Sequence, residues 1–156
     1  MTIKKCIICE SPIFFIQDLE KYKISKCTKC GLEFANPMPT NNELNLFYKE
    51  YSDIRASNNI VLQKNARRIY KDLEKNYGIN KTTNLLDYGS GKNSFITGNF
   101  PNSFKSYDPY TSNNDKKLLL KNSYDVITFL GVLEHLTEIK KTISFLFSLL
   151  KKNGIL

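Results

Sequence analysis

Four cysteines, all between Cys6 and Cys30, constrain the fold of this chain more than any other feature of its sequence. They form two pairs with two residues between the sulfurs of each, Cys6-Ile-Ile-Cys9 and Cys27-Thr-Lys-Cys30. This spacing lets one tight turn point two thiolates at a metal ion, so two turns complete the tetrahedron of a structural zinc site. The segment between the pairs, from Glu10 to Lys26, is long enough for a β-hairpin. The sequence therefore predicts a zinc-ribbon-like module over residues 1–36.

Two disulfide bonds or two redox-active Cys-x-x-Cys motifs are the other arrangements that the cysteines allow. Disulfides are typical of secreted proteins, and the N-terminus lacks the apolar run of a secretory signal. A redox pair would open a helix after a strand, and two copies in one chain would be unexpected. Zinc held by Cys6, Cys9, Cys27 and Cys30 is the interpretation that the pattern favours, with a structural role because no coordination position is open. Since no run of roughly 18 apolar residues occurs, we expect a cytoplasmic protein with no membrane partner.

A linker with two helices is predicted over residues 37–80. Two prolines mark residues 32–39 as a connector, and Thr40 and Glu43 have the spacing of a helix capping box. A second helix is expected from Ser57 to Tyr77, where Gly78 ends it. The first helix carries apolar residues at helical spacing, which we interpret as packing surface: Leu44, Phe47, Tyr48 and Tyr51.

From residue 81 onward, short apolar runs alternate with helical segments. Expected strands are Thr83–Asp87, Phe104–Tyr107 and Tyr124–Leu130, and expected helical segments are Ser94–Thr97, Val132–Leu136 and Thr142–Leu150. Asn153-Gly154 is expected to form a turn before a further strand at Ile155-Leu156. This alternation predicts an α/β domain over residues 81–156, with a Rossmann-like parallel sheet and right-handed crossovers.

A small-residue loop and an acid follow the first two of these strands. The loop is Asp87-Tyr88-Gly89-Ser90-Gly91, at the carboxyl end of a strand, where open α/β sheets bind ligands. Its glycines let a ligand approach the backbone. Asp108 ends the next strand, where a carboxylate can accept hydrogen bonds from both hydroxyls of a ribose. The alternative is that Asp108 is a turn residue before Pro109.

The order of these motifs resembles the class I S-adenosylmethionine-dependent methyltransferases, and more closely their bacterial members with an N-terminal zinc-binding region. The resemblance also covers Phe34–Thr40 and Val132-Leu133-Glu134-His135-Leu136. It implies a partial methyltransferase fold with S-adenosylmethionine and zinc as cofactors. It assigns Asp87, Gly89 and Gly91 to the methionine part of S-adenosylmethionine and Asp108 to its ribose. It places Phe129 and Leu130 at the floor of the site, near the sulfonium.

The same resemblance places Glu134 and His135 beside the substrate pocket. His135 is the only histidine, and an imidazole can act as a general base near neutral pH. The alternative is that His135 caps or packs the helix on which it lies. Family members usually continue with a helix and two strands beyond the position of Leu156. We therefore expect a missing C-terminal segment or a partner chain to complete the fold.

Three functions remain open at this point. The first is methyl transfer to a small-molecule or sugar-linked acceptor. The second is methylation of RNA by a zinc-containing enzyme, which the formal net charge of +8 favours. Against it, the lysines are scattered and the zinc region lacks the interleaved aromatic and arginine residues of RNA readers, so nucleic acid is the less favoured partner. The third is a degenerate, non-catalytic zinc-binding remnant.

Overall fold

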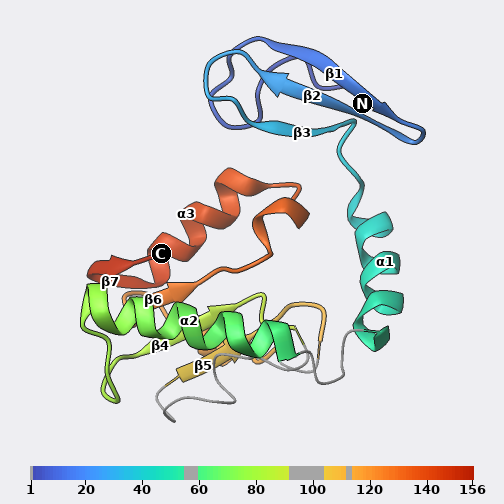
Figure 1. The fold of residues 1–156 in the computed structure, drawn as a ribbon. Coiled ribbons are helices and arrows are strands. Elements are labelled where there is room, and N and C mark those ends of the chain that lie inside the picture. Colours follow the sequence, from blue (N-terminus) through green and yellow to red (C-terminus); the bar gives the residue numbers. More distant parts are fainter. Residues whose placement is uncertain (1, 55–59, 92–103, 112–113) are drawn as a thin grey trace.

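The computed structural model describes residues 2–54, 60–91, 104–111 and 114–156. Within these ranges the chain forms one antiparallel and one parallel β-sheet, connected by two helices (Figure 1). No helix of the described ranges combines the length and the apolar character needed to cross a membrane.

The N-terminal sheet contains β1 (Ile13–Leu19), β2 (Tyr22–Cys27) and β3 (Glu33–Asn36) in that order. The predicted hairpin is confirmed by the antiparallel pairing of β1 with β2. The interpretation of residues 32–39 as a simple connector was wrong, because β3 pairs antiparallel with β2 before Pro37 removes the next backbone donor. Asn36 also fastens the N-terminus to this sheet: its Oδ1 accepts from the Ile3 amide at 2.7 Å and its Nδ2 donates to the Ile3 carbonyl at 2.8 Å.

The helix α1 (Asn41–Ile54) begins at the predicted capping box. The Thr40 amide donates to Glu43 Oε2 at 2.7 Å, and the Glu43 amide donates to Thr40 Oγ1 at 3.2 Å. These two bonds satisfy backbone donors that a helix N-terminus leaves without intrahelical partners. The helix α2 (Ile60–Tyr77) ends at Gly78, whose φ of 66° is the left-handed conformation that glycine adopts readily. Its expected start at Ser57 lies outside the described residues.

The second sheet is parallel, as predicted. Its strands are β4 (Leu85–Tyr88), β5 (Phe104–Tyr107), β6 (Tyr124–Thr128) and β7 (Leu150–Ile155), in the order β5-β4-β6-β7. The helix α3 (Ile139–Leu149) forms the crossover from β6 to β7, and a short 3₁₀ helix, η2 (Lys116–Leu118), precedes β6. The expected helical segment Ser94–Thr97 lies outside the described residues. The domain boundaries after residues 36 and 80 stay predictions.

Two predictions about local structure in this region were wrong. Residues Val132–Leu136 do not begin an α-helix, since only one 3₁₀ turn, η3 (Leu133–His135), forms there. Residues Asn153 and Gly154 do not form a turn before a new strand but lie inside β7. The pairing of β6 with β7 is irregular, because Tyr124 pairs with Leu150 while Val126 pairs with Ile155. The positive φ of 64° at Asn153 lies within this irregular stretch of β7, between the paired residues Leu150 and Ile155.

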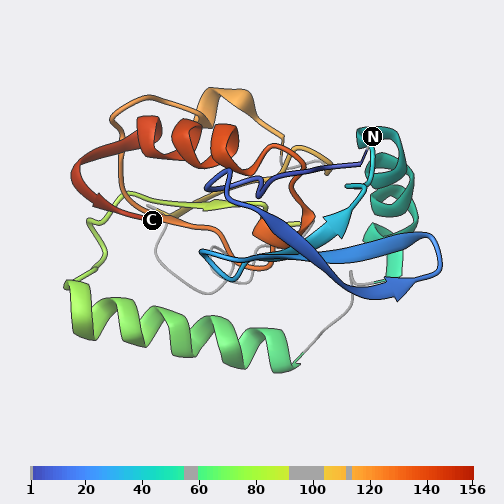
Figure 2. The same ribbon diagram turned by 90° about the horizontal axis from the view of Figure 1, so that it is seen from above.

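Side chains of the parallel sheet alternate between two apolar layers, because successive residues of a strand point to opposite faces. On one face, α3 contributes Leu146 and Leu149 to a cluster with Leu86 and Ile127. On the other face, Tyr70 and Leu73 of α2 pack against a second cluster, formed by Ile79, Leu85, Phe104 and Val126. The result is a three-layer arrangement with α2 and α3 on opposite faces of the sheet (Figures 1 and 2).

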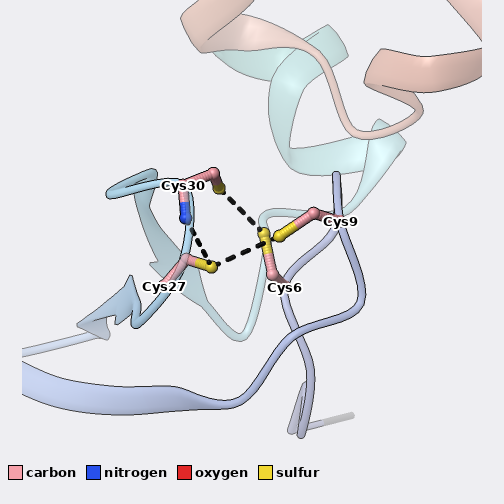
Figure 3. A group of neighbouring side chains, drawn as sticks. All are labelled: Cys6, Cys9, Cys27 and Cys30. Atoms are coloured by element: carbon pink, nitrogen blue, oxygen red, sulfur yellow. Dashed lines mark hydrogen bonds between the residues drawn. The ribbon is translucent and has the colours of Figure 1, made fainter.

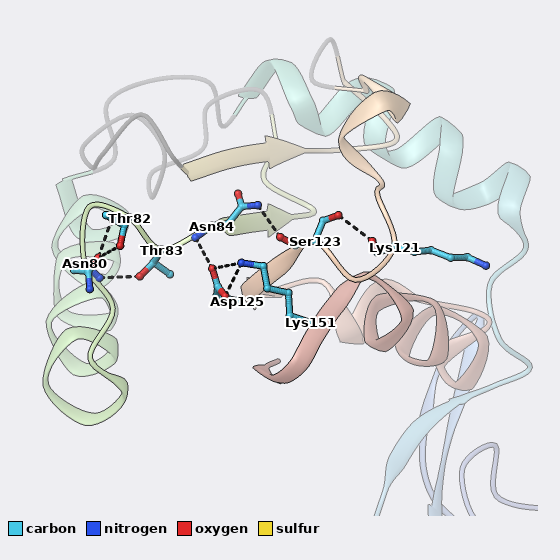
Figure 4. A network of polar contacts seen from close by, with 8 residues as sticks. All are labelled: Asn80, Thr82, Thr83, Asn84, Lys121, Ser123, Asp125 and Lys151. Carbon is cyan, nitrogen blue, oxygen red and sulfur yellow. Dashed lines mark hydrogen bonds and ion pairs between the residues drawn. The ribbon is translucent and has the colours of Figure 1, made fainter.

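Polar contacts pin the strands together at the amino edge of the sheet (Figure 4). Asp125 Oδ2 accepts from the Asn84 amide at 2.9 Å, and Lys151 Nζ lies 2.8 Å from Asp125 Oδ1. Burial acts to raise the pKa of Asp125, but the bonds from Lys151 and Asn84 outweigh it and lower that pKa. Asp125 is therefore an ionised, structural carboxylate at the edge opposite the predicted site.

Candidate functional site

The carboxyl ends of β4, β5 and β6 form the edge at which the predicted site residues gather. The central strand β4 has β5 on one side and β6 on the other, so the chain reverses its direction of travel across the sheet at this point. Open α/β sheets bind ligands in the crevice that such a reversal creates. The loop after β4 and the acid after β5 therefore lie where the topology favours a ligand.

Asp108 joins the glycine loop to the end of β5. Its Oδ2 accepts from the Gly91 amide at 2.8 Å, and its Oδ1 accepts from the Tyr110 amide at 2.8 Å. Among the described residues each carboxylate oxygen accepts one of these two bonds, and Asp108 is 8% exposed. The bond to Tyr110 is the turn contact that the alternative interpretation of Asp108 requires. The bond to Gly91 reaches beyond that turn and brings the two predicted cofactor-binding elements together, while their roles stay predictions.

Gly89 lies where a side chain would not fit. Its φ is 78°, and a Cβ at this position would lie 2.3 Å from Val132 Cγ2. Its amide donates to the Tyr107 carbonyl at 2.8 Å, which holds the loop against β5. The loop after β4 thus touches both β5 and the segment that follows β6. At Gly91, with φ of 68°, a Cβ would have no heavy atom of the described residues within 4 Å, and the Gly91 carbonyl accepts from Ser90 Oγ at 3.2 Å and from Thr111 Oγ1 at 3.4 Å.

The three other predicted cofactor residues occupy different environments at this edge. Asp87 is buried, and its Oδ1 accepts from Thr128 Oγ1 at 2.9 Å, so it ties the end of β4 to the end of β6. Phe129 is partly buried and packs on the core beside the Tyr88 ring, at 5.9 Å between centroids. Leu130 is 47% exposed and presents an apolar surface at the edge.

The predicted catalytic pair, Glu134 and His135, follows β6. Their side chains are exposed, and His135 Nε2 lies 3.9 Å from Glu134 Oε1. The imidazole also meets the ring of Tyr48 from α1 edge-on, with 5.6 Å between centroids. The alternative interpretation of His135 as a packing residue thus holds in part, although its packing partner is α1 and not its own helical turn.

Tyr48 is the residue of this edge that sequence reasoning missed, because it was interpreted as one member of an apolar packing stripe. It stacks on Tyr110 at 5.2 Å with 20° between the ring planes. The sequence held no signal for it, because Tyr51 of the same stripe carries the same side chain.

Comparison with known families decides what kind of domain this is. A family model described as a methyltransferase domain matches residues 61–156, more than half of the chain. The chain belongs to the methyltransferase domain family. The comparisons with curated proteins and with solved structures gave no match. The match and the parallel sheet together support a class I S-adenosylmethionine-dependent methyltransferase.

The methyltransferase carries its cysteine cluster outside the matched region, at the end of the N-terminal sheet (Figure 3). The four sulfurs, which belong to Cys6, Cys9, Cys27 and Cys30, lie within 4.8 Å of one another. Across the pairs the sulfurs of Cys6 and Cys30 are 3.6 Å apart, and those of Cys9 and Cys27 are 3.5 Å apart. A tetrahedral zinc ion with Zn–S bonds of about 2.3 Å would separate its sulfurs by about 3.8 Å. The donor set and its spacing therefore fit a metal ion.

Backbone amides already face two of these sulfurs. The Ile8 amide donates to Cys6 Sγ at 3.4 Å, and the Lys29 amide donates to Cys27 Sγ at 3.4 Å. Hydrogen bonds with Ser11 lower the pKa of Cys9 to about 6. The Leu32 amide acts to lower the pKa of Cys30, but neighbouring sulfurs and desolvation outweigh it and raise that pKa to about 12. Without a metal, the crowded thiols do not all ionise near neutral pH. A bound cation would stabilise all four of them as thiolates.

The clash at Gly89 yields a stability prediction. We expect Gly89→Ala to destabilise the methyltransferase by more than Gly78→Ala, because both residues have positive φ but only Gly89 faces Val132. The left-handed backbone should cost each variant about 1 kcal/mol, with a further ~1–3 kcal/mol for the steric clash at Gly89 alone. Denaturant unfolding of both variants measures the difference. Equal destabilisation would show that the loop after β4 does not pack against Val132.

Proposed function

We propose that this chain transfers a methyl group from S-adenosylmethionine to a small-molecule or sugar-linked acceptor. The observation that supports the proposal most directly is the hydrogen bond from the Gly91 amide to Asp108. It sets the glycine loop beside a carboxylate at the reversal point of the sheet. These are the two kinds of group that a nucleoside with a charged amino-acid tail requires.

Different residues of the carboxyl edge bind different parts of S-adenosylmethionine. Asp108 accepts hydrogen bonds from the ribose hydroxyls through the lone pairs that Gly91 and Tyr110 leave available. Asp87, Gly89 and Gly91 surround the methionine part. Phe129 and Leu130 exclude water from one side. When bound, S-adenosylmethionine supplies an activated methyl group, so the protein contributes mainly alignment of the acceptor.

His135 is the proposed general base of the reaction. Its side chain is 43% exposed, so an acceptor can reach it, and it removes a proton from the acceptor hydroxyl or acidic carbon. Glu134, with Oε1 at 3.9 Å from Nε2, favours the protonated imidazole that results.

Titration with S-adenosylhomocysteine, which lacks the reactive methyl group, tests the cofactor site. We expect Asp108→Ala to weaken binding at least about tenfold, because charge-assisted hydrogen bonds to the ribose are lost. Asp125→Asn is the matched control, since Asp125 lies at the opposite edge and should leave the affinity within about twofold. Isothermal calorimetry on the intact chain measures all three proteins.

Two outcomes would contradict the cofactor proposal. If the wild-type chain binds no S-adenosylhomocysteine while its metal site is intact, the non-catalytic zinc-binding remnant becomes the better explanation. If Asp108→Ala binds as tightly as wild type, Asp108 serves only the turn before Tyr110, and the ribose is held elsewhere.

We infer that the metal of the cysteine cluster is zinc and that its role is structural. Four thiolates with no open position support this choice, and the free state of the cysteines is consistent with a cytoplasmic location. Purified chain should contain about one zinc per molecule by mass spectrometry, and Cys6→Ala should lose it together with the N-terminal hairpin. Lys29→Ala, which changes an exposed side chain between two ligands, should retain the metal. Full occupancy in Cys6→Ala would contradict the assignment.

RNA methylation remains a second candidate because of one surface feature. Five exposed cations occupy a single face of α2, within an arc of about 100° at 3.6 residues per turn. They are Lys64, Arg67, Arg68, Lys71 and Lys75. A row of this kind can contact successive phosphates of a nucleic acid strand.

Exchange of the five cations for glutamine separates the two candidate functions. Under the small-molecule proposal, the chain binds single-stranded RNA weakly. The α2 variant then loses no more RNA affinity than a control variant in which Lys116, Lys117 and Lys121 are exchanged for glutamine. A loss of RNA affinity of at least about tenfold in the α2 variant alone, with a reduced salt dependence, would favour RNA as the acceptor. Electrophoretic or fluorescence titration at two salt concentrations gives the answer.

A further inference from the structure

The helix α1 reaches the carboxyl edge of the parallel sheet through one side chain. Tyr48 stacks on Tyr110 at 5.2 Å between centroids and meets His135 edge-on at 5.6 Å. Tyr110 follows Asp108 in the chain, and His135 follows β6. One residue of the linker therefore contacts both the loop of the proposed ribose-binding acid and the proposed base.

The partners of Tyr48 are themselves tied to the cofactor-binding residues. The Tyr110 amide donates to Asp108 Oδ1 at 2.8 Å. The position of the Tyr110 ring therefore depends on that carboxylate. His135 lies three residues after Val132, which packs against Gly89. The Tyr48 ring thus contacts residues that follow β5 and β6, and Val132 connects the second of these segments to the loop after β4.

A second contact fixes α1 to the same segment. Thr137 Oγ1 donates to Asn41 Oδ1 at 3.1 Å, so the first turn of α1 contacts the chain two residues beyond His135. The opposite side of this turn meets the N-terminal sheet, because Lys21 Nζ lies 2.6 Å from Glu43 Oε1. The helix therefore has partners on both sides, and its position relative to His135 depends on more than the Tyr48 ring.

The exposure of these rings argues against simple core packing. Tyr110 is 51% exposed and the His135 side chain 43%, whereas the buried cluster beside α3 has residues at 0–5%. Edge-on and stacked aromatic contacts favour one orientation of an otherwise exposed imidazole. Such an arrangement orients side chains at a surface that a ligand can reach.

We propose that Tyr48 is a positioning residue for the acceptor side of the site, whose ring holds the His135 imidazole beside Tyr110 and Asp108. This inference rests on the proposed function, in which His135 is the base. It gives the N-terminal part of the chain a role in the reaction: the metal module and the capping box hold α1, and α1 holds the base. The acceptor then binds between the linker helix and the methyltransferase domain.

The single histidine makes the proposal measurable without a substrate. The carbon-bound imidazole protons of His135 give the only histidine signals in a proton–carbon correlation spectrum of the native sequence. We expect Tyr48→Leu to shift both signals toward those of a free, solvent-exposed imidazole, because the neighbouring ring is lost. Tyr48→Phe retains a ring at the same place and should keep both signals near their wild-type positions. Tyr77→Leu, which removes an exposed tyrosine at the end of α2, should leave them unchanged.

Wild-type signals in Tyr48→Leu, with metal content and circular dichroism unchanged, would overturn the proposal. Equal displacement in Tyr48→Phe and Tyr48→Leu would also overturn it, because the ring would then not be what orients the imidazole. If Tyr48→Leu fails to fold, nuclear Overhauser contacts between the His135 and Tyr48 rings in the wild-type chain decide the matter, and their absence contradicts the proposal. These spectra are recorded without cofactor, so their outcome is independent of the S-adenosylhomocysteine titration.

Discussion

The hydrogen bond between the Gly91 amide and the Asp108 carboxylate is the contact on which the rest of this site depends. It crosses from the loop after β4 to the end of β5, and both partners are held by regular backbone pairing of those strands. A parallel sheet brings strand ends together even when they are well separated in sequence, as Gly91 and Asp108 are. A small-residue loop and an acid, each common alone, thereby meet at the edge where the proposed function places a nucleoside.

The two sheets of the chain are stabilised by different interactions. The parallel sheet is held by apolar layers against α2 and α3, which leave its carboxyl edge available. The N-terminal module has only a few buried side chains, among them Cys6, Cys27 and Phe34, so metal binding by four thiolates would supply much of its stability. The linker helix α1 joins the two parts, and Tyr48 is where this connection meets the proposed chemistry.

Local patterns predicted much of this architecture correctly. The capping box at Thr40 forms as expected, because it depends only on residues within one helical turn. The strand Phe104–Tyr107 has the predicted bounds, and Gly78 ends α2 through its own backbone freedom. Prediction failed where distant pairing outweighs local preference. β3 forms because β2 lies beside it, and Asn153-Gly154 stays in β7 because Leu150 and Ile155, on either side of it, pair with β6.

The same distinction between local patterns and distant contacts applies to the candidate site. Residue identity and spacing were sufficient to single out the four cysteines, Gly89, Gly91, Asp108 and His135, because each has a side chain or a backbone freedom that suits a particular chemistry. Which of these residues meet, and which residue of the linker joins them, depends on how the layers pack. Asp125 and Asp108 both lie at strand ends, yet Asp125 forms an ion pair with Lys151 at one edge of the sheet, whereas Asp108 accepts from the glycine loop at the other. Tyr48 shares its spacing with ordinary core residues, so only its contact with His135, which lies far from it in the sequence, distinguishes it.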